Sequence, residues 1–380
     1  MIDLVIVGAF YLALIIFLVK NRRRVEIIGK VVFLLKGRRG IKTFDKLAKI
    51  GWLWEIIFTI GAVFCIFLIF SGIYSMLAYF FLPTIMGVGS PQTAVFLIIP
   101  YKSTLLFSII LLLLVHEASH GIMARVKGVR IKSTGVGAFL FIPLAFVEVE
   151  DRDLEELRRL DRIKIFSAGS FTNILVYLIL ALIISSFLHP FLMKEMMEVK
   201  GVKISYVYGG TPAYESNLSA GMVIQEINGV KINNLSDFRM VMGKVGVGEE
   251  IELIADHKSF RIRTSPHPQN ESKAYLGVGL SEEVGVREDA KAKYGIIGDF
   301  ILWVYDFLLY SSTLNLLIGV VNLLPLFITD GSRLLYDFLD YLIKHAGVKR
   351  MVYNAINLLT VFLFASGAMN ALFRGTFFLL

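Results

Sequence analysis

The sequence predicts a polytopic α-helical membrane protein of about six transmembrane helices, with an inserted, mainly β domain and a membrane-associated β-hairpin. Two observations carry this prediction. The 380 residues are 56% hydrophobic and only 18% charged, and the mean hydropathy of +0.68 is too high for a soluble protein of this size. The apolar residues also gather in runs of membrane-crossing length, separated at one place by a long stretch with the alternation of β-strands.

Six apolar runs are long enough to cross a bilayer, which takes about 20 residues of helix. They cover residues 2–19, 56–82, 104–124, 165–188, 300–325 and 351–373. The single cysteine, Cys65, lies inside the second run, which excludes a disulfide framework and a thiolate metal site. The runs place helices 1–4 within residues 1–190, a β-rich domain at 195–285, and helices 5 and 6 within 296–380.

The net charge of +8 is concentrated in one connection between runs. Residues 20–50 hold eleven Lys and Arg against two acids, whereas the 85–103 connection holds only Lys102. By the positive-inside rule, 20–50 is cytoplasmic and the N-terminus is outside. Contacts with anionic headgroups explain the basic loop better than nucleic acid does, so we expect the lipid bilayer as a partner and no nucleic acid. The apolar segment 25–35 of this loop is expected to lie at the membrane surface.

The third run contains a metal-binding pattern, HEASH, formed by His116, Glu117 and His120. Ionisable residues within a membrane span are costly and usually functional. Residues i and i+4 share a helix face, so the two imidazoles can bind one ion, with Glu117 beside it as a base for a water molecule. A structural pair of buried histidines is the alternative, but all three polar groups would then need partners in hydrocarbon. The metal site is the simpler interpretation, and it suggests peptide-bond hydrolysis within the membrane.

The predicted site lies nearer the cytoplasmic face. His116 follows Thr104 by twelve residues, which is about 18 Å of helix in a hydrocarbon core of about 30 Å. Because the third run crosses from outside to inside, water would reach the histidines from the cytoplasm. The later runs then place 125–164 and 326–350 in the cytoplasm and the β-rich domain outside.

A third protein ligand is expected, because catalytic zinc sites typically have three and an open position. Asn315 and Asn322 are seven residues apart and share a helix face, and Pro325 interrupts that helix at a depth where irregular backbone must be buried or line a cavity. Asp330, followed by a flexible glycine, could fold back to the histidines. An N-cap for a helix at 332–344 is an equally good interpretation of Asp330 from the residues alone.

HEASH in one membrane helix, followed much later by N-x-x-P-x-x-x-x-D-G from Asn322 to Gly331, resembles the site-2 protease family of intramembrane zinc metalloproteases. The resemblance implies a Zn²⁺ cofactor, with the two histidines and Asp330 as metal ligands and Glu117 as general base. It favours the ligand interpretation of Asp330 over the N-cap. It also places Asn322 at the catalytic centre, as a partner of the oxyanion or of the substrate carbonyl.

Residues 167–175, SAGSFTNIL, resemble a further element of that family, usually written G-P-x-x-N. This chain has Gly169-Ser170 in place of Gly-Pro and keeps Asn173. Two roles stay open for Asn173: a contact at the substrate site and a structural hydrogen bond between helices. The same two roles stay open for Asn315.

Residues 135–149 are apolar but too short, and too rich in Gly and Pro, to span the membrane. Two strand-like runs around Ile142-Pro143 predict a hairpin that dips into the membrane, which members of the resembled family also have between these helices. Its edge could pair with an unwound substrate by strand addition. The alternative is a membrane-associated cytoplasmic loop.

Residues 200–283 alternate like the strands of a soluble domain. VIQEI-NG-VKI predicts two strands with an Asn-Gly turn, LSDFRMVMGKV predicts a helix capped by Asn234 or Ser236, and IELIAD and SFRIRT predict two more strands. With the preceding GTPAYESNLSAGM they resemble a PDZ domain of the bacterial protease type, although Gly221-Met222 stands where Gly-Asp is usual. The resemblance implies binding of substrate termini or a size filter, and a passive spacer is the alternative.

Taken together, the resemblances imply a hydrolase: a zinc metalloprotease that cleaves transmembrane segments of single-span membrane proteins in regulated intramembrane proteolysis. Its partners would be membrane-anchored regulators that another protease has already trimmed. Two alternatives remain. A membrane zinc protease for quality control or prenylated-peptide processing would use a downstream Glu ligand and lack a PDZ domain. A non-catalytic PDZ-bearing adaptor would not need an intact Glu117.

Overall fold

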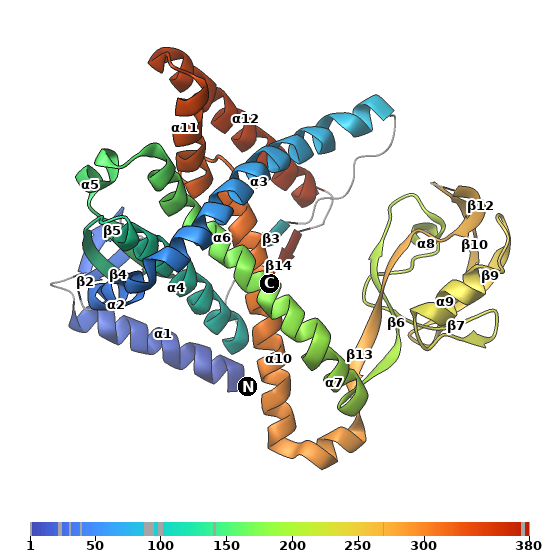
Figure 1. Ribbon diagram of the computed structural model, residues 1–380. Helices are drawn as coiled ribbons and strands as arrows, with labels where there is room; N and C mark the ends of the chain where they lie inside the picture. The colour runs from blue at the N-terminus through green and yellow to red at the C-terminus, as the bar shows by residue number, and fades with distance from the viewer. Residues whose placement is uncertain are drawn as a thin grey trace. The chain divides into compact units, whose positions relative to one another are not determined.

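A computed structural model describes residues 2–21, 25–29, 32–38, 40–86, 95–97, 102–139, 142–268, 270–373 and 377–379. The chain divides into two compact units. The first comprises Met1–Ile184 and Trp303–Leu380, and the second comprises Ser185–Leu302. Figure 1 shows the first unit as mainly helical and the second as mainly β.

The first unit is built from long helices with short ones between them. They are α1 (Ile2–Lys20), α2 (Ile41–Leu47), the 3₁₀ turn η1 (Ala48–Ile50), α3 (Gly51–Met86), α4 (Ser103–Val126), α5 (Asp151–Glu156), α6 (Arg159–Ile183), the later part of α10 (Glu288–Leu323), α11 (Asp330–Leu342) and α12 (Ala346–Phe373). Among the described residues, six helical segments are long and apolar enough to cross a membrane, and each of the six predicted runs overlaps one of them, although several of these segments begin or end well beyond the predicted bounds. The prediction of a polytopic helical membrane protein is therefore confirmed.

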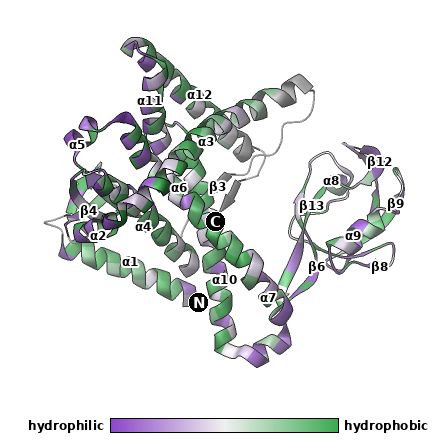
Figure 2. Cartoon of the chain, viewed as in Figure 1, coloured by the Kyte–Doolittle hydropathy of each residue, from purple (hydrophilic) through white to green (hydrophobic). Residues whose placement is uncertain are grey.

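Figure 2 shows that the long helices of this unit consist mainly of hydrophobic residues, and many of their large apolar side chains are exposed. Ile60 and Leu182 are examples of large apolar side chains that stay exposed. Such a surface suits lipid, which is as apolar as the side chains. Behind it, a buried core joins α3, α4 and α6 through Phe58, Met123 and Ile163.

The beginnings of α1 and α4 are tied together. Asp3 accepts hydrogen bonds from the backbone N–H of Ser103, at 2.9 Å, and from the Ser103 hydroxyl. Both helices therefore begin on the same side of the first unit, as the charge pattern predicts for the first and third runs.

An antiparallel sheet of four strands lies against α4, in the order β1-β2-β4-β5. Its strands are β1 (Val25–Ile28), β2 (Val32–Gly37), β4 (Ile131–Phe139) and β5 (Ile142–Val149). The predicted hairpin is β4-β5, which leaves β5 at the edge. The segment 25–35 contributes a second hairpin that the sequence does not predict. Its apolar residues lack strand alternation, and its partner strand lies about a hundred residues away.

The second unit is mainly β. Its strands are β6 (Met197–Val207), β7 (Val223–Ile227), β8 (Val230–Lys231), β9 (Glu250–Ala255), β10 (Lys258–Arg263), β11 (Ser265–His267), β12 (Asn270–Tyr275) and β13 (Val278–Val286). The main sheet has the order β10-β9-β7-β6-β13, with β8 paired to β7. Its helical elements are the π-helical η2 (Ile184–Leu188) after its first residue, α7 (His189–Glu195), α8 (Pro212–Glu215), α9 (Leu235–Met242) and the first part of α10. Elsewhere, β3 (Val95–Leu97) pairs with β14 (Phe377–Leu379).

The local predictions for the second unit are confirmed. Asn228 and Gly229 form the turn between β7 and β8, with φ of 50° and 77°, as an Asn-Gly hairpin turn requires. Asn234, not Ser236, is the N-cap of α9, because its side chain accepts a 2.9 Å hydrogen bond from the backbone N–H of Asp237. An inserted, mainly β domain is thus present in this helical protein.

Candidate metal centre

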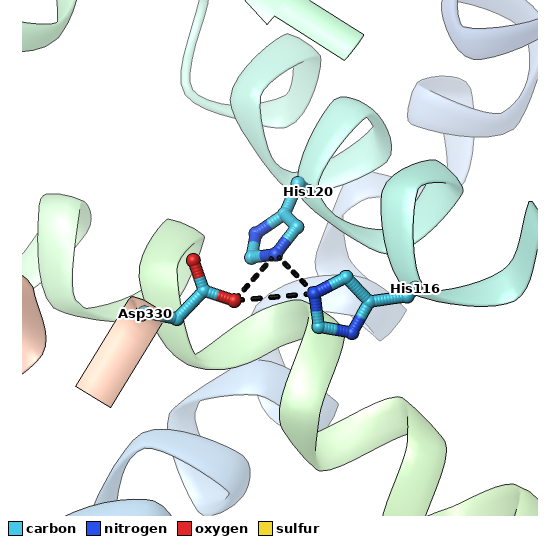
Figure 3. A group of neighbouring side chains, drawn as sticks. All are labelled: His116, His120 and Asp330. Carbon is cyan, nitrogen blue, oxygen red and sulfur yellow. Dashed lines mark hydrogen bonds and ion pairs between the residues drawn. The ribbon is translucent and has the colours of Figure 1, made fainter. Parts of the chain in front are cut away.

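Two histidines of α4 and one acid of α11 meet inside the first unit (Figure 3). The Nε2 atoms of His116 and His120 lie 3.3 Å apart. Oδ2 of Asp330 lies 3.2 Å from Nε2 of His116 and 3.0 Å from Nε2 of His120. All three side chains are largely buried, with exposed fractions of 9%, 14% and 14%. The predicted histidine pair and Asp330 therefore converge on one point.

The two Nε2 atoms and Oδ2 of Asp330 are spaced as the ligands of a metal ion are. A tetrahedral zinc with ligand bonds of about 2.0–2.1 Å separates its ligand atoms by about 3.3 Å. The observed separations of 3.0–3.3 Å match that spacing. Two imidazole nitrogens and a carboxylate oxygen also form a typical zinc donor set. A cation between them would stabilise lone pairs that otherwise face one another in a poorly solvated interior.

The break between α10 and α11 brings Asp330 to the histidines. Helix α10 ends at Leu323, two residues before Pro325, and α11 begins at Asp330. Thr329 is the N-cap of α11, so the N-cap interpretation of Asp330 is wrong. The Asp330 side chain therefore does not occupy the N-cap position and points at α4 instead.

The backbone of Gly331 packs closely against the end of α10 at this break. A Cβ atom on Gly331 would lie 1.9 Å from the carbonyl oxygen of Leu323, so a side chain has no room there. Glycine is needed for this contact rather than for the flexibility that the sequence suggests. Asn357 of α12 supports the same turn, since its Oδ1 accepts from the backbone N–H of Phe327 at 2.8 Å and from the Ser332 hydroxyl at 2.7 Å.

Helix α11 is fixed to α6 by a forked ion pair. The Arg162 guanidinium donates to both oxygens of Asp337, at 2.6 Å and 2.9 Å. Both side chains are mostly buried. Bidentate pairs of this kind add geometric specificity as well as energy. This ion pair thus fixes the position of α11, which carries Asp330, relative to α6, which packs against the two histidines.

Helix α6 also sets the proton position of His120. Nδ1 of His120 lies 2.7 Å from the carbonyl oxygen of Ile165, which can only accept. Nδ1 therefore carries the proton, and the lone pair of the neutral ring lies on Nε2, the atom that faces His116 and Asp330. Metal-binding histidines commonly have such a support on the second nitrogen.

Gly169 lets α6 approach the two imidazoles. A Cβ atom at this position would lie 2.4 Å from Nε2 of His120 and 2.7 Å from Cε1 of His116. The absence of a side chain at residue 169 therefore forms one wall of the site. Sequence reasoning missed this role, although the resemblance to G-P-x-x-N was a signal that pointed to this glycine.

Gly169→Ala is expected to weaken metal binding, because the added methyl group would push His120 from its position. Zinc content after dialysis and the melting temperature of the purified protein measure the effect. Gly8→Ala on α1 is the control, since a Cβ there has no atom of the described residues within 4 Å. Equal zinc content in the two variants would show that residue 169 does not shape the site.

Glu117 contacts the edge of the hairpin. Its Oε2 accepts a 3.1 Å hydrogen bond from the backbone N–H of Val147 in β5. This contact, which the sequence does not reveal, fixes the carboxylate beside the outer edge of β5. The neighbouring Glu148 is tied into the sheet. The hydrogen bond from the Ser133 hydroxyl has the largest effect and lowers its pKa, burial opposes this, and the Lys36 ammonium lowers the pKa further.

The three asparagines take different places. Nδ2 of Asn322 lies 3.1 Å from both Nε2 of His116 and Oδ2 of Asp330, directly at the cluster. Asn173 is fully buried, with its amide 3.1 Å from Nδ1 of His116. Asn315 is also fully buried, but its Nδ2 donates to the carbonyl of Ser311 in its own helix, at 2.7 Å. The structure thus brings Asn322 and Asn173 to the site and gives Asn315 a contact within α10.

Known proteins resemble this chain at the level of sequence. Residues 104–366, from α4 to α12, match the family model of peptidase family M50. A protein of Methanocaldococcus jannaschii, described as uncharacterized, is 27% identical over 349 residues, which cover 89% of this chain and 86% of its own length. The PDZ domain of the SdrC-like protein from Listeria monocytogenes is 22% identical, with 21% of this chain and 87% of that domain covered and a TM-score of 0.20.

Proposed function

Because this chain belongs to peptidase family M50, we propose that it is a zinc-dependent intramembrane endopeptidase that cleaves transmembrane segments of single-span membrane proteins. Membership makes it a multi-pass membrane metalloprotease. The observation that carries the finer proposal is the cluster of His116, His120 and Asp330, with ligand atoms within 4.8 Å of one another. The histidines belong to a helix of membrane-crossing length, so the peptide bond that reaches them belongs to a membrane-embedded substrate.

The residues around the cluster can divide the work of hydrolysis. Zinc bound by the two histidines and Asp330 would act as a Lewis acid on water and the substrate carbonyl. Glu117 takes the proton from the attacking water and delivers it to the leaving amine. The N–H of Val147 orients the Glu117 carboxylate for this task. Asn322 donates from α10 to the oxygen on which negative charge develops, since its Nδ2 already faces the cluster.

Strand β5 offers the substrate a place to unwind. A helical span hides its carbonyls in its own hydrogen bonds, so it must open before hydrolysis. The N–H of Val147 points outward from the sheet to Glu117, and because backbone groups alternate along a strand, those of Ala145 point the same way. Because the N–H of Val147 already donates to Glu117, an unwound substrate would pair with the outward groups of Ala145, beside the proposed base.

An apolar cavity of about 430 Å³ lies between α1, α4 and the β4-β5 hairpin. Phe10 and Leu14 of α1, Leu113 of α4 and Leu144 of β5 contribute to its lining. Leu113 and Glu117 are four residues apart and share a face of α4. We assign this cavity to apolar side chains of the substrate span.

We propose that the second unit binds the chain termini of the substrate. Strand β13 lies at the edge of its sheet, and α9 packs beside it through a 3.2 Å hydrogen bond from the backbone N–H of Leu235 to Glu282. An extended chain terminus can add to such an edge, which would favour substrates that have already been trimmed. In the proposed topology this unit and the N-terminus lie outside, with the metal centre near the cytoplasmic side, following the charge of residues 20–50.

Removal of zinc tests the function directly. The native protein, reconstituted in lipid vesicles, is expected to cleave a labelled single-span peptide whose span contains Gly, Pro or Asn. A chelator should abolish cleavage, and zinc should restore it, because the proposed chemistry needs the ion. Soluble unfolded casein serves as the control substrate and should remain intact. Cleavage that persists without metal, or that prefers casein, would contradict the proposal.

A further inference from the structure

We infer that Asn173 is a positioning residue of the metal centre: its amide oxygen accepts the Nδ1 proton of His116 and thereby directs Nε2 of that ring to the metal. This inference rests on the proposed function, because it presupposes a metal ion at Nε2. This role differs from both interpretations that the sequence leaves open for Asn173, because the residue acts on a metal ligand rather than on the substrate or on helix packing alone.

The hydrogen-bonding groups of Asn173 identify its partner. Its amide nitrogen lies 3.1 Å from Nδ1 of His116, and both residues are buried, with Asn173 wholly inaccessible. Its Oδ1 has no hydrogen-bond partner among the described residues. A buried carbonyl without a donor has lost its hydrogen bond to water and gained none in return, so this arrangement is incomplete.

Metal binding resolves the mismatch. Nε2 of His116 faces His120 and Asp330, so a metal there takes the lone pair on Nε2 and leaves the proton of the neutral ring on Nδ1. A proton on Nδ1 needs an acceptor, and the amide nitrogen of Asn173 is a donor. Rotating the carboxamide by 180° exchanges two groups of nearly equal size and places Oδ1 against Nδ1–H. One rotation thus gives both the ring and the amide oxygen a partner.

Helix α6 then supports both histidines. The carbonyl of Ile165 accepts from Nδ1 of His120, and Asn173, eight residues later on the same helix, accepts from Nδ1 of His116. Eight residues are slightly more than two helical turns, so both acceptors face α4. Gly169 lies midway and gives the rings their room. These three positions form one supporting face.

The neighbours of Asn173 keep its side chain in place. A Cβ on Gly319 of α10 would lie 3.2 Å from Cβ of Asn173 and 3.2 Å from the carbonyl of Ser170, so α10 packs tightly here. The buried Ser170 hydroxyl, three residues before Asn173 and on the same helix face, also lacks a partner among the described residues. The Ser170 hydroxyl could accept a hydrogen bond from the amide nitrogen of Asn173 after the rotation. Ser170 stands where the G-P-x-x-N pattern has proline.

Two variants separate positioning from packing. Asn173→Leu keeps the approximate shape of the side chain but removes the acceptor, and we expect zinc affinity to fall about 10–100-fold. Asn173→Asp keeps an oxygen at the same place and should remain within about 3-fold of the native affinity, since carboxylates also support metal-binding histidines. Chelator competition on the purified protein measures both values without any substrate. Equal affinity of the Leu and native proteins would overturn the inference, as would an Asp variant as weak as the Leu variant.

A spectroscopic measurement reports on the ligand geometry. With Co²⁺ in place of zinc, the visible absorption bands of the native and Asp variants should agree in position, and those of the Leu variant should shift or weaken. A bond that serves only to hold helices together would lower the melting temperature of the metal-free protein in both variants and leave the Co²⁺ bands unchanged. That result would also overturn the inference.

Ser311→Ala is the matched control, because it removes another buried bond between helices. The Ser311 hydroxyl donates to Ser108 of α4 at 2.9 Å, away from the cluster. Its zinc affinity should equal that of the native protein, and a loss as large as that of Asn173→Leu would overturn the inference. Failure of the native protein to bind zinc would instead refute the proposed function, so the two failures are distinguishable.

Discussion

Glu117→Gln is expected to bind zinc as the native protein does and to cleave about 10²–10⁴-fold more slowly, the usual contribution of a general base. Glutamine has almost the same shape as glutamate and can still contact the N–H of Val147 through its carbonyl oxygen, so the α4–β5 contact survives. It cannot take a proton from water at neutral pH. Elemental analysis of the purified variant and product formation from a single-span peptide in vesicles measure the two effects.

The control for this change is Glu156→Gln on α5. Glu156 pairs with Arg152 on the surface, with 69% of its side chain exposed. This variant loses a carboxylate of the same type without touching the metal centre, and its cleavage rate should be native. Cleavage at the native rate by Glu117→Gln would sink the assignment of the base.

Asp330→Ala should abolish stable zinc binding and, with it, cleavage. The change removes one of three ligand atoms, so the loss of affinity should exceed the roughly 100-fold that follows from removing a supporting hydrogen bond. Two histidines four residues apart would remain, a set that falls short of the three ligands of catalytic zinc sites. Zinc content after dialysis and chelator competition report the loss independently of activity.

Asp306→Ala is the matched control for this acid. Asp306 lies on α10 sixteen residues before Asn322, which is about 24 Å of helix away from the cluster. Its removal should leave zinc content unchanged. Zinc retention by Asp330→Ala, at the level of the native and Asp306→Ala proteins, would mean that α11 supplies no ligand.

The helices, turns and strands could be predicted where they depend on residues close together in the sequence. Apolar runs of bilayer length identified the helices, and the Asn-Gly pair located the turn at Asn228 and Gly229. The hairpin β4-β5 was predicted from two strand-like runs around Ile142-Pro143, although the structure places these two residues within β5, paired with Phe139 and Ala138. The second hairpin, β1-β2, could not be predicted, because its stability depends on pairing with β4 across α2, α3 and α4 in sequence. Long-range pairing leaves little mark on a short apolar segment.

The site divides in the same way. The spacing of His116 and His120 alone puts both rings on one face of a helix, because the period of the helix is fixed by the backbone. The neighbouring sequence alone did not decide the role of Asp330, since an acid at the start of a helix can cap the helix or bind a metal. The fold decided it, by placing Thr329 at the cap and Asp330 within 3.2 Å of both imidazoles.

The sequence by itself determined that this is a helical membrane protein with an inserted β domain and half of a metal site, because bilayer length, strand alternation and helical period are properties of neighbouring residues. Only the tertiary structure decided what completes and supports that half. It brought Asp330 to the histidines, the N–H of Val147 to Glu117, and the Gly169 face of α6 against both rings. Each of these contacts joins residues 30 or more positions apart in the sequence, and such contacts are set by packing rather than by local pattern.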